Sequence, residues 1–197
     1  MKTPRLQVIS ASRTVESLIL SIKAILLGEH GSGRTLIFSR IVGKAASSLI
    51  TFSGITTGYR ILSIADKQVQ LAVWDYSGSA VPFGSQVRFF SDAHAVLVVF
   101  DVSTRDSFTS ARKRVQQIRI QHPAVVIAIL GNKADLPRKS WEVHEEDVEE
   151  LITSIAPLTS FVSAKTGIGV QEILESTVLE VIRKQNRADS DYSFSTV

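Results

Sequence analysis

The chain has 197 residues, of which 44% are hydrophobic and 21% are charged. This composition is that of an ordinary globular domain with a sizeable core, so it excludes a chain that is disordered throughout. The net charge of +3 is too small, and the aromatic residues (7%) are too sparse, to indicate a nucleic-acid-binding surface.

The sequence contains no cysteine, which excludes disulfides, cysteine-ligated metals and lipid anchors attached through a thiol. The most apolar stretch, residues 17–28, is interrupted by Lys23 and is too short to span a bilayer. We therefore expect a cytoplasmic protein without a direct lipid anchor. Such a protein would lie at membranes or at cytoskeletal transport machinery only through a partner.

A globular domain is expected over residues 20–186, after an N-terminal extension of mixed character at 1–19. The polar, serine-rich residues 187–197 predict a flexible C-terminal tail. Within the domain, short β-branched apolar runs predict strands, and amphipathic segments between them predict helices. The expected strands are 23–27, 60–64, 71–74, 95–102, 125–130 and 159–162, and the expected helices are 34–48, 106–121, 143–155 and 168–185.

Strands that alternate with helices over this length predict an α/β fold with a six-stranded, mostly parallel sheet and helices on both faces. In folds of this class, ligands bind in the loops at the carboxyl ends of the strands. We therefore expect the functional residues in those loops.

The first predicted strand runs directly into the segment Gly28-Glu29-His30-Gly31-Ser32-Gly33-Arg34-Thr35. It matches the phosphate-binding pattern G-x-x-x-x-G-K-[ST] at every fixed position except one, where arginine replaces lysine. The glycines let backbone N–H groups turn toward an anion, and the following helix adds the positive end of its dipole. The Thr35 hydroxyl is a candidate Mg²⁺ ligand. Taken alone, the motif leaves open a glycine-rich turn without function.

Arg34 keeps the positive charge of the usual lysine but not its shape. The planar guanidinium is bulkier than an ammonium group, so it can sit differently in the loop or swing out of it. We therefore expect nucleotide binding that is weakened but not abolished.

Two further motifs follow the fifth and sixth predicted strands: Gly131-Asn132-Lys133-Ala134-Asp135 and Ser163-Ala164-Lys165. With them, the sequence resembles the Ras-superfamily GTPases, whose base-reading signatures are N-K-x-D and S-A-K, over about residues 22–186. It is most similar to the Rab branch, because several of its segments stand at the same positions as in Rab proteins. These segments are Trp74-Asp75, Phe89-Phe90 and Phe100-Asp101-Val102-Ser103. The resemblance implies the P-loop small GTPase fold, GTP or GDP as the ligand, and Mg²⁺ as a cofactor.

The resemblance also assigns roles in reading the base. The Asp135 carboxylate would accept hydrogen bonds from the N1–H and 2-amino groups of guanine, a donor pair that adenine lacks. Lys133 would lie against the purine face, and Asn132 would tie the base loop to the phosphate loop. The N–H of Ala164, between Ser163 and Lys165, would donate to the guanine oxygen. A kinase or ATPase directed at adenine would leave both motifs unexplained.

The second switch motif of the family, D-x-x-G-Q, reads Asp75-Tyr76-Ser77-Gly78-Ser79 here. The resemblance implies that Asp75 holds Mg²⁺ through water and that the N–H of Gly78 senses the γ-phosphate. Ser79 stands where the family has the glutamine that orients the attacking water, and serine is too short for that role. We therefore expect slow GTP hydrolysis and assign no catalytic residue. His30 stands at a position of small residues in the family, where it would crowd the γ-phosphate.

The residues of the first switch cannot be aligned with those of the family without ambiguity. An ungapped alignment back from Asp75 places Phe52 where the family has a Mg²⁺-binding threonine. Hydroxyl side chains stand nearby, and the sequence does not choose among Thr51, Ser53, Thr56 and Thr57.

The sequence therefore predicts a Rab-like guanine-nucleotide-binding switch with weak GTP hydrolysis. It would recruit protein effectors through switch regions at about 49–58 and 76–91 in vesicle or flagellar trafficking. The alternative is a non-hydrolysing scaffold subunit that is recruited by a transport complex. The missing glutamine and the missing lipid site favour the scaffold, whereas the intact base motifs count against a version without nucleotide.

Overall fold

The computed structural model describes residues 19–43, 50–52, 54–76, 90–154, 156 and 158–194, with the side chains of 50–52, 150–154 and 188–194 left aside. Almost all of the predicted N-terminal extension lies outside these residues. The elements in chain order are β1 (Leu20–Gly28), α1 (Arg34–Val42), β2 (Ile50–Phe52), β3 (Ile55–Ile64), β4 (Lys67–Tyr76), β5 (Ala95–Asp101), α3 (Arg105–Gln121), β6 (Val126–Asn132), the 3-10 turn η1 (Arg138–Ser140), α4 (Glu145–Ser154), β7 (Leu158–Phe161) and α5 (Val170–Phe194).

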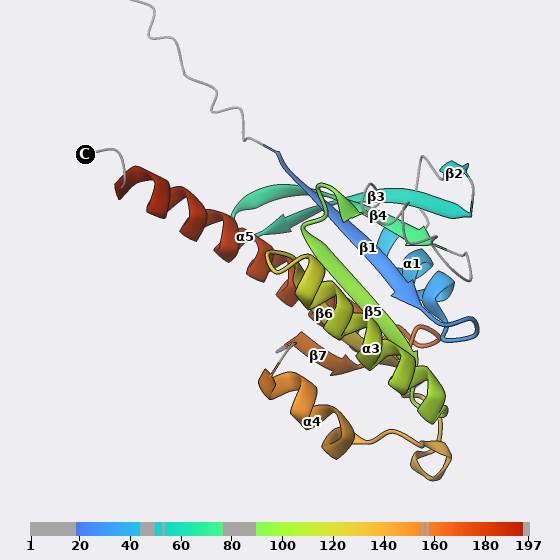
Figure 1. The fold of residues 1–197 in the computed structure, drawn as a ribbon. Coiled ribbons are helices and arrows are strands. Elements are labelled where there is room, and N and C mark those ends of the chain that lie inside the picture. The colour runs from blue at the N-terminus through green and yellow to red at the C-terminus, as the bar shows by residue number, and fades with distance from the viewer. Residues whose placement is uncertain are drawn as a thin grey trace, which may run out of the picture.

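The strands form one sheet in the order β2-β3-β4-β1-β5-β6-β7 (Figure 1). The pairs β4–β1, β1–β5, β5–β6 and β6–β7 are parallel, whereas β3 is antiparallel to both β4 and β2. The predicted α/β fold with a mostly parallel sheet is confirmed. The short edge strand β2 adds a seventh strand to the six that were predicted, because three residues are too few to form a recognisable apolar run.

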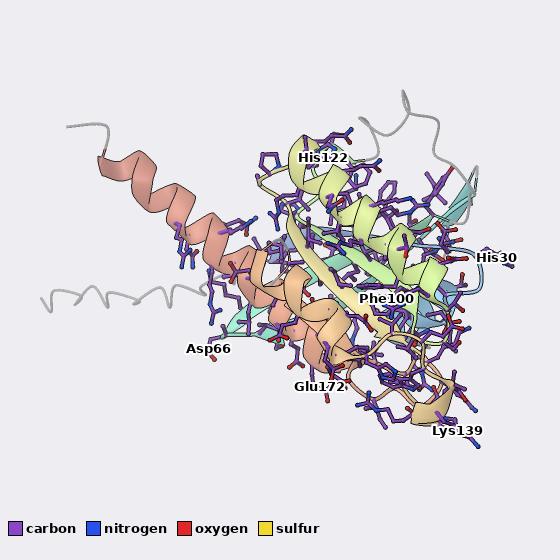
Figure 2. All side chains as sticks on the ribbon, turned by 60° about the horizontal axis from the view of Figure 1, so that its bottom comes forward. His30, Asp66, Phe100, His122, Lys139 and Glu172 are labelled. Atoms are coloured by element: carbon purple, nitrogen blue, oxygen red, sulfur yellow. The ribbon has the colours of Figure 1, made fainter. Side chains whose placement is uncertain are left out.

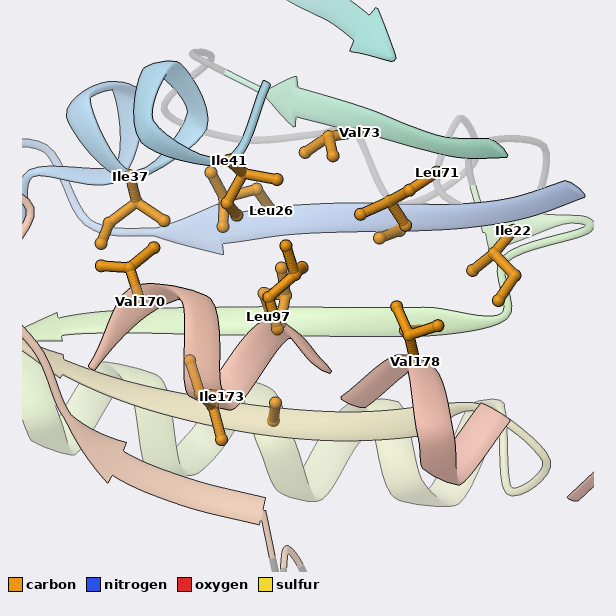
Figure 3. Close-up of a cluster of buried hydrophobic side chains, with 14 of the residues drawn as sticks. Ile22, Leu26, Ile37, Ile41, Leu71, Val73, Leu97, Val170, Ile173 and Val178 are labelled. Atoms are coloured by element: carbon orange, nitrogen blue, oxygen red, sulfur yellow. The ribbon is translucent and has the colours of Figure 1, made fainter. Parts of the chain in front are cut away.

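Successive side chains of the central strands point to opposite faces of the sheet. Every residue of β5 and β6 is buried, so both faces of the sheet are covered there. In β1, Ala24 and Leu26 join a core cluster with α1 and α5, whereas Ile25 and Leu27 join a second cluster with α3 and α4. Figure 3 shows the first cluster, in which α1 and α5 side chains meet those of the strands. Helices thus cover both faces, as predicted.

The helix α5 continues to Phe194, past residue 187, where the sequence analysis placed the start of a flexible tail. The physical reason is that residues 170–194 contain neither glycine nor proline, so nothing in this segment stops a helix. Figure 1 shows the end of α5 projecting beyond the sheet. In the described part of the chain, no helix is long and apolar enough to cross a bilayer.

Candidate functional site

The phosphate loop, residues 28–34, joins the carboxyl end of β1 to the first turn of α1. Gly31 and Gly33 have φ angles of 80° and 83°, which are costly for a residue with a side chain. At Gly33 a Cβ atom would also lie 2.2 Å from Nδ2 of Asn132. Glycine at this position therefore allows the loop after β6 to approach the phosphate loop closely.

Ser32 lies inside this loop and is 1% exposed. Among the described residues, its Oγ is a buried side-chain oxygen that has no hydrogen-bond partner. A buried hydroxyl without a partner is costly, so a bound oxygen atom that accepted its proton would be stabilised. The glycine backbone and this hydroxyl together fit an anion such as a phosphate group.

Two clefts adjoin the phosphate loop. His30 lines both of them, and Figure 2 shows it projecting from the loop at the edge of the molecule. The first cleft, of about 400 Å³, is lined by Glu29, His30, Gly31, Ser32, Asp101, Thr104, Asp106, Ser107, Ser110 and Lys133. The second, of about 430 Å³, is lined by Glu29, His30, Gly31, Gly33, Arg34, Thr35 and Leu36.

Asn132 connects the two loops that the sequence assigned to one nucleotide. Its Nδ2 donates to the backbone oxygen of Ser32 at 2.8 Å, and its Oδ1 accepts from the N–H of Ala164 at 2.8 Å. Asn132 is 2% exposed, so both hydrogen bonds are shielded from water. The Ala164 N–H that the sequence analysis assigned to the guanine oxygen is thus engaged by Asn132. A base contact from this N–H stays a prediction and would require that bond to be exchanged.

Asp135 and Ser163 lie side by side although 28 residues separate them. The Ser163 hydroxyl donates to Oδ1 of Asp135 at 2.6 Å, and Nζ of Lys165 lies 3.7 Å from Oδ2. The hydrogen bond from Ser163 is the main cause that holds the pKa of Asp135 below its usual value. Asp135 is therefore ionised at neutral pH and offers only acceptors, as the recognition of two guanine donors requires.

Lys133 has a φ of 69° and pairs through Nζ with Oδ2 of Asp101, at the carboxyl end of β5. Burial pushes the pKa of Asp101 up, but the hydrogen bonds from Lys133 and Ser103 outweigh burial and leave it lowered. The ion pair fixes the position of the lysine at the wall of the first cleft. In the sequence, Asp101 stands out only by its place in the family register, and its pairing with Lys133, 32 residues away, has no local signal.

Arg34, the residue that departs from the phosphate-binding pattern, folds back against the sheet. Its Nε donates to Oδ1 of Asp75 at 2.5 Å, and its Nη1 donates to the backbone oxygen of Gly28 at 2.6 Å. The Thr35 hydroxyl donates to the other carboxylate oxygen of Asp75 at 3.1 Å. The side chains of Arg34 and Asp75 are 11% and 2% exposed, so this is a nearly buried ion pair.

The predicted Mg²⁺ ligands, Thr35 and Asp75, therefore lie together but bond to each other and to Arg34. Mg²⁺ demands oxygen ligands in near-ideal octahedral geometry. Here Oδ1 of Asp75 already accepts from the Arg34 guanidinium, whose charge would repel a divalent ion, and Oδ2 accepts from the Thr35 hydroxyl. Over the described ranges, no cluster of three or more histidine, aspartate or glutamate residues offers another metal site. These side-chain positions do not fit Mg²⁺ as the family pattern would place it.

The switch residues are described only in part. Gly78 and Ser79 lie outside the described residues, so their assigned roles stay predictions. Ser53 also lies outside, and Thr51 stands in β2. Thr56 and Thr57 stand in β3 and pair with β4. A ladder position suits β-branched residues and by itself indicates no metal ligand.

Arg40, near the end of α1, is a positioning residue that the sequence analysis missed. Its Nε donates to the backbone oxygen of Ala164 at 2.7 Å, and its Nη2 donates to the backbone oxygen of Lys165. Arg40 therefore binds the S-A-K loop to α1. One basic residue in a helical segment carries no signal of a partner 124 residues away.

A family profile described as the Ras family matches residues 23–183, a span that contains all the site residues named above. The Ras-related protein Rab-26 of Bos taurus is 28% identical over 89% of this chain and 69% of its own length. Ras-related protein Rab5A of Oryza sativa subsp. japonica is 27% identical, over 87% and 85%. Ras-related protein RAB1BV of Beta vulgaris is 30% identical, over 86% and 79%.

Proposed function

This chain belongs to the Ras family, and we propose that it acts there as a Rab-like switch that binds guanine nucleotide and hydrolyses GTP slowly. The observation that carries the proposal is Asn132, which is bonded to the phosphate loop at Ser32 and to the S-A-K loop at Ala164. A nucleotide has a phosphate end and a base end. Because Asn132 holds the phosphate loop and the S-A-K loop together, one nucleotide could contact the first loop with its phosphates and the second with its base. The unpartnered hydroxyl of Ser32 supports the phosphate end.

Guanine is the base that this arrangement favours. An ionised Asp135 accepts hydrogen bonds from the N1–H and 2-amino groups of guanine, whereas adenine offers no such pair. Ser163 orients the carboxylate by donating to one of its oxygens, and Lys165 lies near the other.

Slow hydrolysis is the second part of the proposal. Ser79 stands at the glutamine position and is too short to orient the attacking water. Arg34 bonds to Asp75 and Gly28, so its guanidinium is shared with these acceptors and is not offered whole to a γ-phosphate. Protein effectors would read the nucleotide state through residues 49–58 and 76–91, and resemblance to the Rab branch supports a role in vesicle or flagellar trafficking.

The nucleotide content of the freshly purified chain tests both parts of this proposal. The protein is denatured, and the released nucleotides are separated by chromatography. We expect mainly GTP, because binding persists while hydrolysis is slow. Mainly GDP would contradict slow hydrolysis and keep the switch. No guanine nucleotide, together with failed loading in excess GTP with and without Mg²⁺, would overturn the proposal.

The alternative of a scaffold subunit without hydrolysis has one observation in its favour, the closed pair of Arg34 and Asp75. This pair ties the guanidinium of Arg34, which stands at the lysine position of the phosphate-binding pattern, to a carboxylate of the protein. Failure to bind any guanine nucleotide is the outcome that would leave this alternative.

The substitution Asp135→Asn tests the base site. Asparagine offers one donor and one acceptor, which match the C2 oxygen and N1–H of xanthine rather than the two donors of guanine. We expect this variant to bind xanthosine diphosphate (XDP) about tenfold or more tightly than GDP, whereas the unsubstituted chain should bind GDP more tightly. Asp66→Asn, the same change in the exposed β3–β4 turn, is the matched control and should leave the preference for GDP unchanged. If Asp135→Asn and Asp66→Asn had the same ratio of XDP affinity to GDP affinity, the assignment of Asp135 would be contradicted.

A further inference from the structure

We propose that Arg34 supplies at Asp75 the positive charge that Mg²⁺ supplies in the family pattern, so that guanine nucleotide binds to this chain without Mg²⁺. The inference rests on the proposed function, since it concerns the cofactor requirement of the same site. It predicts a GTP-binding protein whose nucleotide affinity does not respond to removal of divalent cations.

The first step of the argument is the charge of Asp75. This carboxylate is 2% exposed at the end of β4, and a buried charge is stable only when it is paired and hydrogen-bonded. Both of its oxygens have partners inside the protein, Nε of Arg34 and the hydroxyl of Thr35. The carboxylate is thus neutralised without a metal ion.

The second step is the shape of the arginine. Its guanidinium donates in two directions at once, to Asp75 on β4 and to the backbone oxygen of Gly28 at the end of β1. A lysine ammonium is a single point charge on a thinner stem and lacks this planar fork. The substitution that breaks the phosphate-binding pattern is therefore the one that lets the side chain bridge two strands.

The third step is the repulsion between cations. A divalent ion coordinated through Asp75 would face a guanidinium that already contacts the same carboxylate at 2.5 Å. Mg²⁺ also gives up its own water reluctantly and needs well-placed oxygens in return. The Thr35 hydroxyl donates its proton to Asp75 and keeps its oxygen lone pairs, so the conflict with Mg²⁺ arises at Asp75, where the guanidinium lies.

The test measures the release of fluorescent GDP from the full chain. The purified protein is loaded with N-methylanthraniloyl-GDP, and its dissociation is followed after excess GDP is added in Mg²⁺ or in EDTA. We expect EDTA to change the dissociation rate of the unsubstituted chain by less than about twofold. In Arg34→Lys, which restores the usual residue, EDTA should accelerate dissociation by about tenfold or more, the effect of losing a charge-assisted contact.

Arg183→Lys, the same change on the exposed face of α5, is the matched control and should behave like the unsubstituted chain. Acceleration by EDTA in the unsubstituted chain, as large as in Arg34→Lys, would overturn the inference and leave the proposed function intact. Failure to bind the fluorescent GDP in either buffer would overturn both.

A second measurement needs no variant. Mn²⁺, a paramagnetic stand-in for Mg²⁺, is titrated into the GDP-loaded chain and followed by electron paramagnetic resonance. We expect no Mn²⁺ held by the complex of the unsubstituted chain. One tightly bound Mn²⁺ per complex would contradict the inference even if Arg34→Lys did not fold.

Discussion

The guanidinium of Arg34 lies between acceptors from two strands, the carboxylate of Asp75 and the carbonyl of Gly28. At the scale of single residues, this pair places a positive and a negative charge, both nearly buried, beside the glycine-rich loop. Lys133 and Asp101 form a comparable pair on the side of the first cleft, but the lysine side chain there is 37% exposed. Loss of the Arg34 pair should therefore cost more than loss of an exposed pair.

We expect Arg34→Ala to lower the free energy of unfolding by about 3 kcal/mol, because it leaves the Asp75 carboxylate buried and unpaired. Urea-induced unfolding of the nucleotide-stripped protein measures this change. Arg183→Ala removes an exposed arginine and should cost less than about 1 kcal/mol. In Arg34→Ala with Asp75→Asn, part of the lost stability should return. If the double variant lost as much stability as Arg34→Ala and Asp75→Asn lose in sum, the two residues would not be coupled.

At the scale of elements, both ends of α1 are bound to the loops that carry the N-K-x-D and S-A-K motifs. Asn132 holds the phosphate loop at the start of α1, and Arg40 holds the carbonyls of Ala164 and Lys165 near its end. The loop after β7 is therefore held in a fixed position relative to α1.

We expect Arg40→Met to raise the dissociation rate of fluorescent GDP by about tenfold, since it keeps an unbranched apolar stem but removes two charged hydrogen bonds to the S-A-K loop. Hydrogen exchange of the amides at 163–167 should be faster in this variant. Arg183→Met is the control without such contacts to the loop. Unchanged exchange at 163–167 would show that Arg40 does not hold the loop.

At the scale of the whole molecule, several carboxyl groups have a lower pKa in the folded chain than their ordinary value. Besides Asp101 and Asp135, the hydrogen bond from Arg105 lowers the pKa of Asp147, and the hydrogen bond from Arg138 lowers that of Glu145 to about 2. A carboxyl with a lowered pKa stabilises the fold above its unfolded pKa, and that stability is lost as the pH falls through the folded value.

We therefore expect the melting temperature to fall as the pH is lowered from about 4.5 toward 2, the window set by these carboxyl groups. Circular dichroism measures thermal unfolding at pH 6 and pH 3. Asp147→Asn should show a smaller difference between the two pH values, because one linked group is gone. Asp66→Asn should keep the full difference. Equal differences in all three proteins would mean that the ion pair of Asp147 contributes nothing.

Much of the fold was predictable because its signals are local. Apolar runs and helical spacing indicated most of the strands and helices. β2, the 3-10 turn η1 and the far end of α5 were missed, and β3 and β4 begin several residues before their predicted starts. The helix predicted at 34–48 was too long, because α1 ends at Val42 and Gly43 follows with a φ of 77°. Part of the site was equally local, since the glycine-rich loop and the two base motifs follow directly after strands. Parallel strands bring such loops to one edge, so their order along the chain was enough to predict their meeting.

The sequence by itself determined which side chains stand at the carboxyl edge of the sheet. Only the tertiary structure decided the partners of those side chains. Arg34 bonds to a carboxylate 41 residues away, Arg40 to a loop 124 residues away, and the N–H of Ala164 to Asn132. The physical reason is that a donor takes the acceptor nearest in space, and strand order, which brings distant segments together, sets that distance.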